Sequence, residues 1–269
     1  MRSSCWLALE RVDVDRAAYE TFARNEADHF WFVGRRAIFF DVLHRHLDTR
    51  LPQDARILDM GCGVGGMMEP LRSFGSVVGM DLDRDSLRYC RERGFDEVLT
   101  ALGDHLPFPD ASFDLVCAFD VLEHIPEEME TLAECRRILK PGGHLFISGP
   151  AYQFLYTHQD KMVHHQRRYT LGALKRKVRA SGFEIVKSSY VNFFLFPLIL
   201  AALMIKKLRE AVSPPSDSET RFNTDVAMPG ALNKFFAWIF SSERHVVRHV
   251  SVPAGHSLIV LAKKTGGTT

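Results

Sequence analysis

The stretch that decides the fold is 57-ILDMGCGVGG-66, a short apolar run that ends in a glycine-rich loop. Gly61, Gly63 and Gly66 satisfy the spacing G-x-G-x-x-G. Glycine at such positions lets a backbone take positive φ or pass close to a ligand. When this spacing follows a strand and opens a helix, it is typical of the first turn of a nucleotide-binding sheet. The loop alone does not identify the nucleotide.

Strand-like and helix-like segments alternate after this loop. Strands are predicted at 56–60 (RILDM), 76–83 (SVVGMDLD), 96–101 (DEVLTA), 113–119 and 144–150 (HLFISGP), with helices at 85–94 and 127–139. Such alternation favours an α/β fold with a doubly wound, Rossmann-like sheet. Ligands of these sheets lie at the carboxyl ends of the strands, where the glycine loop and Asp81 both fall.

The segments on either side of this core have a different character. Residues 15–50 carry apolar side chains at roughly helical spacing, which predicts a helical preface. Beyond residue 150 come a histidine-rich loop, a basic helix, a strand, an apolar run and a last strand at 257–264. We therefore divide the chain into an N-terminal helical cap (1–50), an α/β core (51–189), a hydrophobic helical insertion (190–255) and a final strand with its tail (256–269).

The composition is that of an ordinary globular protein. The 269 residues are 46% apolar and 25% charged, and a formal net charge of +1 gives no bulk electrostatic argument for nucleic-acid binding. The five cysteines form no C-x-x-C pair, which favours a reduced protein without disulfides or a cysteine-rich zinc site. The opening MRSSCWLALERVDVD lacks the long apolar core of a secretory signal, so a cytoplasmic location is expected.

Asp59, two residues before the first glycine, discriminates between nucleotides. A redox dinucleotide would place its pyrophosphate on this loop, where a carboxylate repels it. S-adenosylmethionine (SAM) instead carries an amino group and a positive sulfonium, which suit an acid there. Asp81 lies 20 residues after Gly61 and suits the ribose hydroxyls of either ligand, so it does not discriminate.

Five motifs, in order, carry a family resemblance. They are D-x-G-C-G-x-G from Asp59, VVGMDLD (77–83), GDHLPFPDASFDLV (103–116), LEHI (122–125) and LKPGGHLFIS (139–148). Together they resemble the class I SAM-dependent methyltransferases, most closely the small-molecule branch called type 11 or 12. HFWFVGRR (29–36) and HQDKMVHHQRRYT (158–170) also resemble a bacterial subgroup of that branch. The resemblance implies a seven-stranded sheet with one antiparallel strand near its edge, SAM as cofactor and S-adenosyl-L-homocysteine as product.

The resemblance also assigns cofactor contacts to the ends of the first two strands. Asp59, Gly61 and Gly63 would line the methionine and ribose part of SAM. Asp81 would take the ribose hydroxyls, and Leu82 would lie beside the adenine.

Further cofactor contacts are implied in the second half of the core and in the cap. Asp104 would accept a hydrogen bond from the adenine amino group, with His105 packed nearby, and Asp120 would approach the methionine amino group. In relatives the helix before the first strand closes over the cofactor. Trp31 and Arg35 are the residues expected to do so here, Arg35 by pairing with the methionine carboxylate.

Methyl transfer displaces a neutral leaving group from a sulfonium, so alignment and desolvation can supply most of the catalysis. A base is needed only if the acceptor must lose a proton, and histidine is the natural base near neutral pH. His124 in LEHI is the best placed, with His158 and His164 as further candidates and a packing role as the alternative. The pattern H-x-D-x3-H-H that starts at His158 matches no metal-site template, so no metal is expected.

A basic stretch predicts contacts with the acceptor. Residues 161–179 hold seven Lys or Arg and no acid. Arg167, Arg168 and Tyr169 would contact an anionic group of the acceptor or anionic lipid heads, with a solvated helix face as the alternative. Tyr152, just past the fifth strand, is the remaining predicted substrate contact.

The apolar run FFLFPLILAALMI (193–205) spans 13 residues and contains Pro197, whereas a membrane-spanning helix needs about 20. Basic residues follow it up to 209, and an aromatic helix, KFFAWIF (234–240), comes later in the same insertion. Apolar, basic and tryptophan side chains together are typical of an interfacial helix. A pocket lid is the first interpretation, peripheral contact with the inner membrane face through 193–209 the second, and a homodimer interface the third.

The function expected from these features is SAM-dependent methyl transfer to an O or N atom of a small, apolar or lipid-linked acceptor. A non-catalytic SAM-binding regulator or scaffold is the alternative from another class. An NAD-linked reductase is disfavoured by Asp59 and by the lack of an evident Tyr-x-x-x-Lys pair. Nucleic-acid methylation is disfavoured by the near-neutral charge and by the lack of an N/D-P-P-Y-like motif after the fourth strand.

Overall fold

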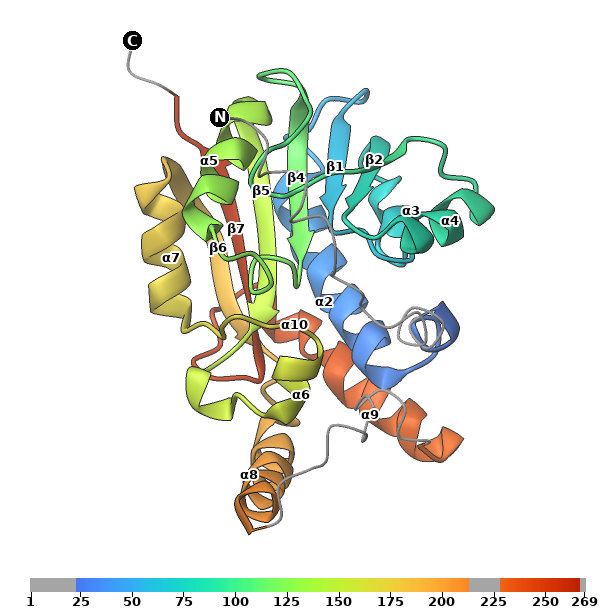
Figure 1. Cartoon of the computed structure of the whole chain (residues 1–269), viewed down its shortest axis with the longest axis vertical. Coiled ribbons are helices and arrows are strands. Elements are labelled where there is room, and N and C mark those ends of the chain that lie inside the picture. Colours follow the sequence, from blue (N-terminus) through green and yellow to red (C-terminus); the bar gives the residue numbers. More distant parts are fainter. Residues whose placement is uncertain (1–22, 213–227, 267–269) are drawn as a thin grey trace, which may run out of the picture.

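The computed structural model describes residues 23–212 and 228–266, and Figure 1 shows a central sheet flanked by helices. The strands are β1 (Arg56–Met60), β2 (Ser76–Asp81), β3 (Val98–Thr100), β4 (Phe113–Phe119), β5 (Leu139–Pro150), β6 (Phe183–Val191) and β7 (Ser257–Lys264). The helices are α2 (Phe30–Leu47), α3 (Met68–Leu71), α4 (Arg84–Glu92), α5 (Glu128–Ile138), η2 (Gln153–Leu155), α6 (His158–Met162), α7 (Leu171–Ala180), α8 (Phe196–Val212), α9 (Gly230–Ser242) and α10 (Arg244–Val247).

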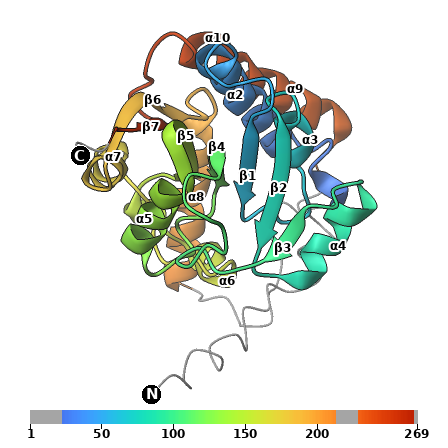
Figure 2. The same ribbon diagram turned by 90° about the horizontal axis from the view of Figure 1, so that it is seen from above.

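The seven strands lie in the order β3-β2-β1-β4-β5-β7-β6. β1 pairs in parallel with β2 on one side and β4 on the other, whereas β7 is antiparallel to both β5 and β6 (Figure 2). The predicted seven-stranded Rossmann-like sheet, with its one antiparallel strand near the edge, is therefore confirmed. The strand order reverses beside β1, and such a switch point opens the crevice in which doubly wound sheets bind ligands.

Apolar side chains on both faces explain why the central strands are buried. All seven residues of β4 are buried, as expected for a strand covered by helices on both sides. One face packs against α5 and α7, and the other against α2, α9 and α10 (Figure 2). On the second face, Phe39 of α2 stacks on Phe119 and packs against Phe146, with ring centroids 5.9 and 5.4 Å away.

Some boundaries differ from the prediction. β5 begins at Leu139, whereas the fifth strand was predicted to begin at residue 144. The segment 151–170, predicted as a loop, contains η2 and α6 because Thr157 and Asp160 form a reciprocal capping box that starts a helical turn. The predicted third strand shortens to three residues. Residues 15–22 of the helical preface and the linker 213–225 lie outside the described residues.

The insertion before β7 is helical, and its two long helices are placed differently. α9 packs along α2, where Gly34 leaves room for Phe240: a Cβ at Gly34 would lie 2.3 Å from that ring. α8 extends from the end of the molecule toward which β4 and β5 point (Figure 1). Across residues 23–212 and 228–266, no helix has the length and apolar content that crossing a membrane requires.

Candidate active site

The glycine loop turns sharply at the carboxyl end of β1. Gly61 and Gly63 have φ of 71° and 52°, values that favour glycine. A Cβ at Gly61 would lie 2.4 Å from Val121, whereas a Cβ at Gly63 would meet nothing within 4 Å among the described residues. Gly61 is therefore required by packing, and Gly63 leaves its backbone open to a ligand.

Asp81, at the end of β2, holds this loop in place. Its Oδ2 accepts a hydrogen bond from the Gly63 N–H at 2.8 Å, and its Oδ1 accepts one from the Asp83 N–H at 3.0 Å. Burial raises the pKa of Asp81 despite these bonds. The carboxylate thus lies beside the open backbone of the loop.

Asp59 lies on the neighbouring strand β1 and is 1% exposed. Neither of its carboxyl oxygens has a hydrogen-bond partner within residues 23–212 and 228–266. Burial, and secondarily the nearby Asp81, raises the pKa of Asp59 well above its usual range. A buried carboxyl group without a partner is costly, so this site suits a ligand that brings a cationic donor.

Asp120 directly follows β4 and adopts a positive φ of 54°. Its Oδ1 accepts a hydrogen bond from the Ser148 hydroxyl at 2.7 Å, and its N–H donates back to that hydroxyl oxygen at 3.1 Å. Its Oδ2 lies 2.7 Å from Nη2 of Arg35, a buried side chain of α2. The guanidinium also lies over the rings of Trp31 and Phe39, at 5.6 and 5.4 Å.

Buried Nε of Arg35 has no acceptor in the described part of the chain. Arg35 therefore keeps a donor for an anion beside Asp120, as the predicted pairing with a carboxylate requires. Trp31, on the same helix, packs against Phe240 and His256 with ring centroids 5.7 and 5.4 Å away, so its ring also belongs to the packing under α9.

The residues predicted beside the adenine lie in two loops at the same end of the sheet. Leu82 directly follows β2 and is partly buried. Asp104 and His105 lie between β3 and β4, Asp104 partly buried and His105 exposed. Because β2 and β3 are adjacent and parallel, both loops begin at the same end of the sheet.

His124 lies in the turn after β4, beside a second histidine. Its ring is 4.7 Å from that of His165, and burial with the nearby His165 lowers the pKa of His124 to about 4. His124 is therefore neutral at pH 7. The other two predicted catalytic histidines are placed differently: His158 is the first residue of α6, and His164 is exposed with a φ of 59°.

His165 was not chosen from the sequence, although it belongs to a connected group. Its Nδ1 lies 2.8 Å from Oδ1 of Asp160, and Arg168 donates to both carboxylate oxygens at 2.7 and 3.0 Å. Burial alone would raise the pKa of Asp160, but the bonds from His165 and Arg168 bring it well below its usual range. Arg168, predicted to contact an anionic acceptor, is thus paired with a carboxylate of its own chain.

The other predicted substrate contacts also make internal bonds. Tyr169 is buried, and its hydroxyl donates to Glu128 Oε2 at 2.8 Å, while Arg167 lies 3.1 Å from Glu128 Oε1. Through these contacts with Glu128, both side chains hold the segment before α7 against the start of α5. Tyr152 stacks on Tyr190 with centroids 5.1 Å apart, and burial raises its pKa to about 12.

Sequence reasoning missed Ser148 and Glu123, and it noted Asp160 and His165 only as part of the pattern H-x-D-x3-H-H, for which no metal was expected. Ser148 was visible as a polar residue at the end of the apolar strand HLFISGP, and Glu123 as the acid that precedes His124. The contact between Asp160 and His165 could not be predicted from the sequence, because a spacing of five residues is not typical of any site.

Comparisons with known proteins find similar sequences and folds. Residues 58–147 match the model of a family described as "Methyltransferase domain". A ubiquinone biosynthesis O-methyltransferase from Thiobacillus denitrificans is 34% identical over 151 residues, which are 51% of this chain and 63% of the relative. A Mycolicibacterium smegmatis protein described as a probable S-adenosylmethionine-dependent methyltransferase is 28% identical over 163 residues, which are 59% and 61% of the two chains.

The fold also matches solved structures. Phosphoethanolamine N-methyltransferase 2 of Haemonchus contortus, solved with phosphomonomethylethanolamine and S-adenosylhomocysteine, has a TM-score of 0.60 and 17% identity, over 96% of this chain and 60% of that one. The present chain spans less than two thirds of the length of each relative named above. The matched domain, the five ordered motifs and the sheet order together support a class I SAM-dependent methyltransferase of the type 11 branch.

Proposed function

We propose that this protein transfers the methyl group of SAM to an oxygen or nitrogen atom of a small, apolar or lipid-linked acceptor. The observation that carries the proposal is that Asp59, Asp81 and Asp120 lie at the carboxyl ends of the neighbouring strands β1, β2 and β4, where Asp81 binds the Gly63 N–H and Asp120 pairs with Arg35. Acids at the ends of β1, β2 and β4 and one arginine match the ammonium, ribose hydroxyls and carboxylate of a single ligand. When bound, SAM supplies an electrophilic methyl group on its sulfonium.

Each predicted contact then has a definite task. Asp81 accepts from the ribose hydroxyls, while Asp59 and Asp120 compensate the ammonium charge. Arg35 binds the methionine carboxylate through donors that the ion pair with Asp120 leaves over. Gly61 keeps the loop turned, as packing against Val121 requires.

The remaining predicted contacts complete the proposed site. Leu82, Asp104 and His105 border the adenine, and Trp31 helps α2 to close over the methionine end. His124 is neutral at pH 7 and can accept a proton from the acceptor. His158 and His164 stay predictions, as does Tyr152 on the acceptor side.

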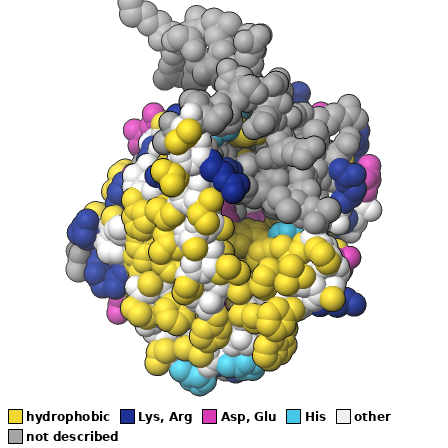
Figure 3. Space-filling view, turned by 90° about the horizontal axis from the view of Figure 1, so that it is seen from below, with side chains coloured by type: hydrophobic (Ala, Val, Ile, Leu, Met, Phe, Trp, Pro, Cys, Tyr) yellow, Lys and Arg dark blue, Asp and Glu magenta, His cyan; other side chains and the backbone are white. Residues whose placement is uncertain are grey.

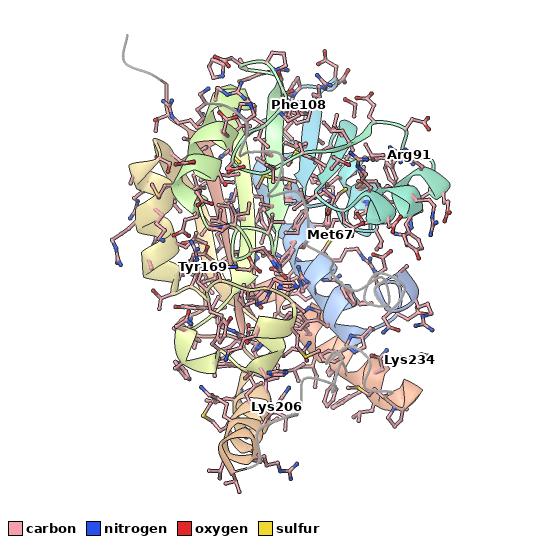
Figure 4. All side chains as sticks on the ribbon, viewed as in Figure 1. Met67, Arg91, Phe108, Tyr169, Lys206 and Lys234 are labelled. Carbon is pink, nitrogen blue, oxygen red and sulfur yellow. The ribbon has the colours of Figure 1, made fainter. Side chains whose placement is uncertain are left out.

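The surface of the insertion indicates the class of acceptor. α8 and α9 expose large apolar side chains, namely Leu198, Met204, Ile205, Leu208, Val212, Leu232, Phe235 and Trp238. Seen from below, hydrophobic side chains gather over this end of the molecule (Figure 3), and Lys206 of α8 and Lys234 of α9 lie at the same end (Figure 4). A lid would turn such side chains inward, so outward placement favours contact with a membrane surface.

A lipid-linked acceptor fits this placement. The carboxyl ends of β4 and β5 point toward the end that bears α8 and α9 (Figure 1), so an acceptor held in a bilayer would reach the site along the shortest path. Oxygen is the preferred acceptor atom, because the similar Thiobacillus denitrificans protein is described as an O-methyltransferase. A homodimer through the same apolar face is the competing use of this surface.

The deciding experiment combines binding and transfer. Wild-type protein and Asp81→Ala are titrated with SAM, S-adenosyl-L-homocysteine and NADH, and methyl-labelled SAM is then incubated with a total lipid extract. Binding of the first two ligands, loss of that binding in Asp81→Ala, and label recovered in the lipid phase are expected. Binding of NADH alone would overturn the proposal. Tight SAM binding without transfer to lipid or small-molecule acceptors would favour the non-catalytic regulator instead.

A further inference from the structure

Three metal-ligating side chains meet beside the proposed cofactor site, and only one of them, His124, has a task in the proposed function. Glu123 and His124 lie in the turn after β4, and His165 comes from the segment between α6 and α7. One ligand atom from each lies within 4.8 Å of the others. Glu123 Oε1 is 4.0 Å from His165 Nε2.

Glu123 is the least satisfied member of this cluster. Its side chain is 0% exposed, and neither carboxylate oxygen has a hydrogen-bond partner in residues 23–212 and 228–266. A buried carboxylate without a donor is expensive, whereas a bound cation compensates it directly. An acid in this position therefore points to a positive ligand.

His165 is oriented as a metal ligand would be. Asp160 is fixed by two hydrogen bonds from Arg168 and one from the Thr157 N–H at 2.8 Å, so its carboxylate can only accept from the ring. The proton of His165 therefore lies on Nδ1, 2.8 Å from Asp160, and the lone pair of Nε2 is turned toward Glu123. This carboxylate–histidine arrangement is the usual support behind a metal-bound imidazole.

We propose that Glu123, His124 and His165 bind a divalent first-row transition metal ion, such as Zn²⁺ or Mn²⁺, and leave at least one coordination position open. Two imidazole nitrogens and one carboxylate oxygen suit such ions better than Mg²⁺ or Ca²⁺, which prefer oxygen ligands. Ligand bonds of about 2.1 Å in a tetrahedral site separate neighbouring ligand atoms by about 3.4 Å, so closing the site takes shifts of about 1 Å.

The ion would also refine the proposed function, on which this step rests. An acceptor hydroxyl in the open position would have its pKa lowered and lose its proton to water. The resulting oxygen attacks the sulfonium methyl group, the C–O bond forms as the C–S bond breaks, and S-adenosyl-L-homocysteine leaves neutral. His124 is then a ligand and not a base. Asp120, three residues before Glu123, keeps the cofactor next to the ion.

The test measures metal binding first, without activity. Full-length protein is stripped with a chelator and titrated with Zn²⁺, and with Co²⁺ as a spectroscopic probe. Wild type and the control His249→Ala, which removes an exposed histidine outside the cluster, are expected to bind one equivalent. Glu123→Gln and His165→Ala are expected to bind at least 100-fold more weakly. Asp160→Asn, which acts through His165, is expected to lose about 10- to 100-fold.

SAM titration of the same variants separates the two proposals. Unchanged SAM affinity in folded Glu123→Gln and His165→Ala, together with lost metal binding, supports the metal site. Equal Zn²⁺ affinity in wild type and both variants, or no binding by wild type that still binds SAM, overturns it and leaves the proposed function intact. Loss of SAM binding by wild type would instead count against the proposed function.

Discussion

Arg35 of α2 and Asp120 at the end of β4 form an ion pair, with 2.7 Å between Nη2 and Oδ2, and the aspartate is held by Ser148. The family resemblance assigns these two residues to the two charged groups on the α-carbon of the methionine moiety, Arg35 to the carboxylate and Asp120 to the amino group. Their pairing joins the helix before the sheet to the strand at the switch point. A zwitterionic ligand can insert between them at little electrostatic cost, because each charge exchanges one partner for another.

The substitution Asp120→Asn is expected to raise the Kd for SAM at least tenfold, which corresponds to about 1.4 kcal/mol. The change removes the charge that faces the ammonium and leaves buried Arg35 without its partner. Isothermal titration calorimetry measures the effect. Arg88→Ala, which breaks an exposed pair with Glu92 on α4, is the control and should bind SAM like wild type. Equal SAM affinities in all three proteins would mean that Asp120 does not contribute to SAM binding.

Gly61 and Gly63 should respond differently to alanine. At Gly63 a left-handed backbone costs about 1–2 kcal/mol, and the new methyl group would meet no atom of the described residues within 4 Å while lying next to the proposed ligand. At Gly61 the methyl group also collides with Val121. Gly61→Ala should therefore show the larger fall in melting temperature. Gly63→Ala should stay folded and lose SAM affinity, and a Gly63→Ala protein with normal affinity would contradict the assignment.

His144 in β5 makes folding sensitive to acid. It is 3% exposed, neither ring nitrogen has a hydrogen-bond partner in the described part of the chain, and burial, with Lys263 and Arg50 nearby, lowers its pKa to about 4. Between about pH 6.5 and 4 the unfolded chain binds the extra proton, so stability is full above this window and is lost as pH falls through it.

The substitution His144→Leu should abolish this dependence. Between pH 7 and pH 5 the wild type is expected to lose about 2 kcal/mol more unfolding free energy than the variant. Urea unfolding followed by circular dichroism at both pH values gives the difference. The exposed His249, changed to leucine, should leave the wild-type pH dependence intact. A parallel loss in wild type and His144→Leu would mean that His144 is protonated in the folded state.

The apolar end of the molecule should bind anionic membranes. Leu208 and Trp238 are each 68% exposed, on α8 and α9. Wild-type protein is expected to co-sediment with phosphatidylglycerol vesicles more than with phosphatidylcholine vesicles, because basic side chains accompany this face. The double variant Leu208→Glu, Trp238→Glu should lose this binding. Met129→Glu, at an exposed position on α5, is the matched control.

A concentration-dependent dimer would show up in the same proteins. If analytical ultracentrifugation finds a wild-type dimer that the double variant abolishes, while neither binds vesicles, the apolar face joins two copies of the chain. That outcome would replace membrane contact with the homodimer interpretation.

Local patterns were enough to predict the core of the fold. The alternation of apolar strands and helices located β1 to β5, the spacing from the glycine loop located Asp59 and Asp81, and the family resemblance located Asp120. The reversed direction of β7 came from the family resemblance and not from periodicity, because an apolar strand such as SLIVLAKK reads the same in either direction. The turn that begins α6 was not predicted, because it depends on the reciprocal hydrogen bonds between Thr157 and Asp160.

Contacts between distant segments could not be read from spacing. Arg168 was interpreted as a free cation for an acceptor, yet it binds Asp160, eight residues earlier, only because the chain folds back at α6. Tyr169 reaches Glu128 across 41 positions of sequence. Basic residues in a row therefore predicted the charge of this segment correctly, but not whether that charge was already paired.

β7 is the last strand in the sequence but lies between β5 and β6 in the sheet, so two parts of the sheet are completed at different stages of synthesis. The strands that carry the proposed cofactor contacts, β2, β1, β4 and β5, are contiguous in the sheet and are all made before residue 151. Among the described strands, β6 pairs only with β7, so it has no strand beside it until residues 257–264 are synthesised and inserted. During synthesis the cofactor half can therefore assemble early, while the half that bears α8 waits for a single late strand. A nascent chain that stalls in the insertion would expose both an open sheet edge and an apolar helix, which is the state a chaperone would have to protect.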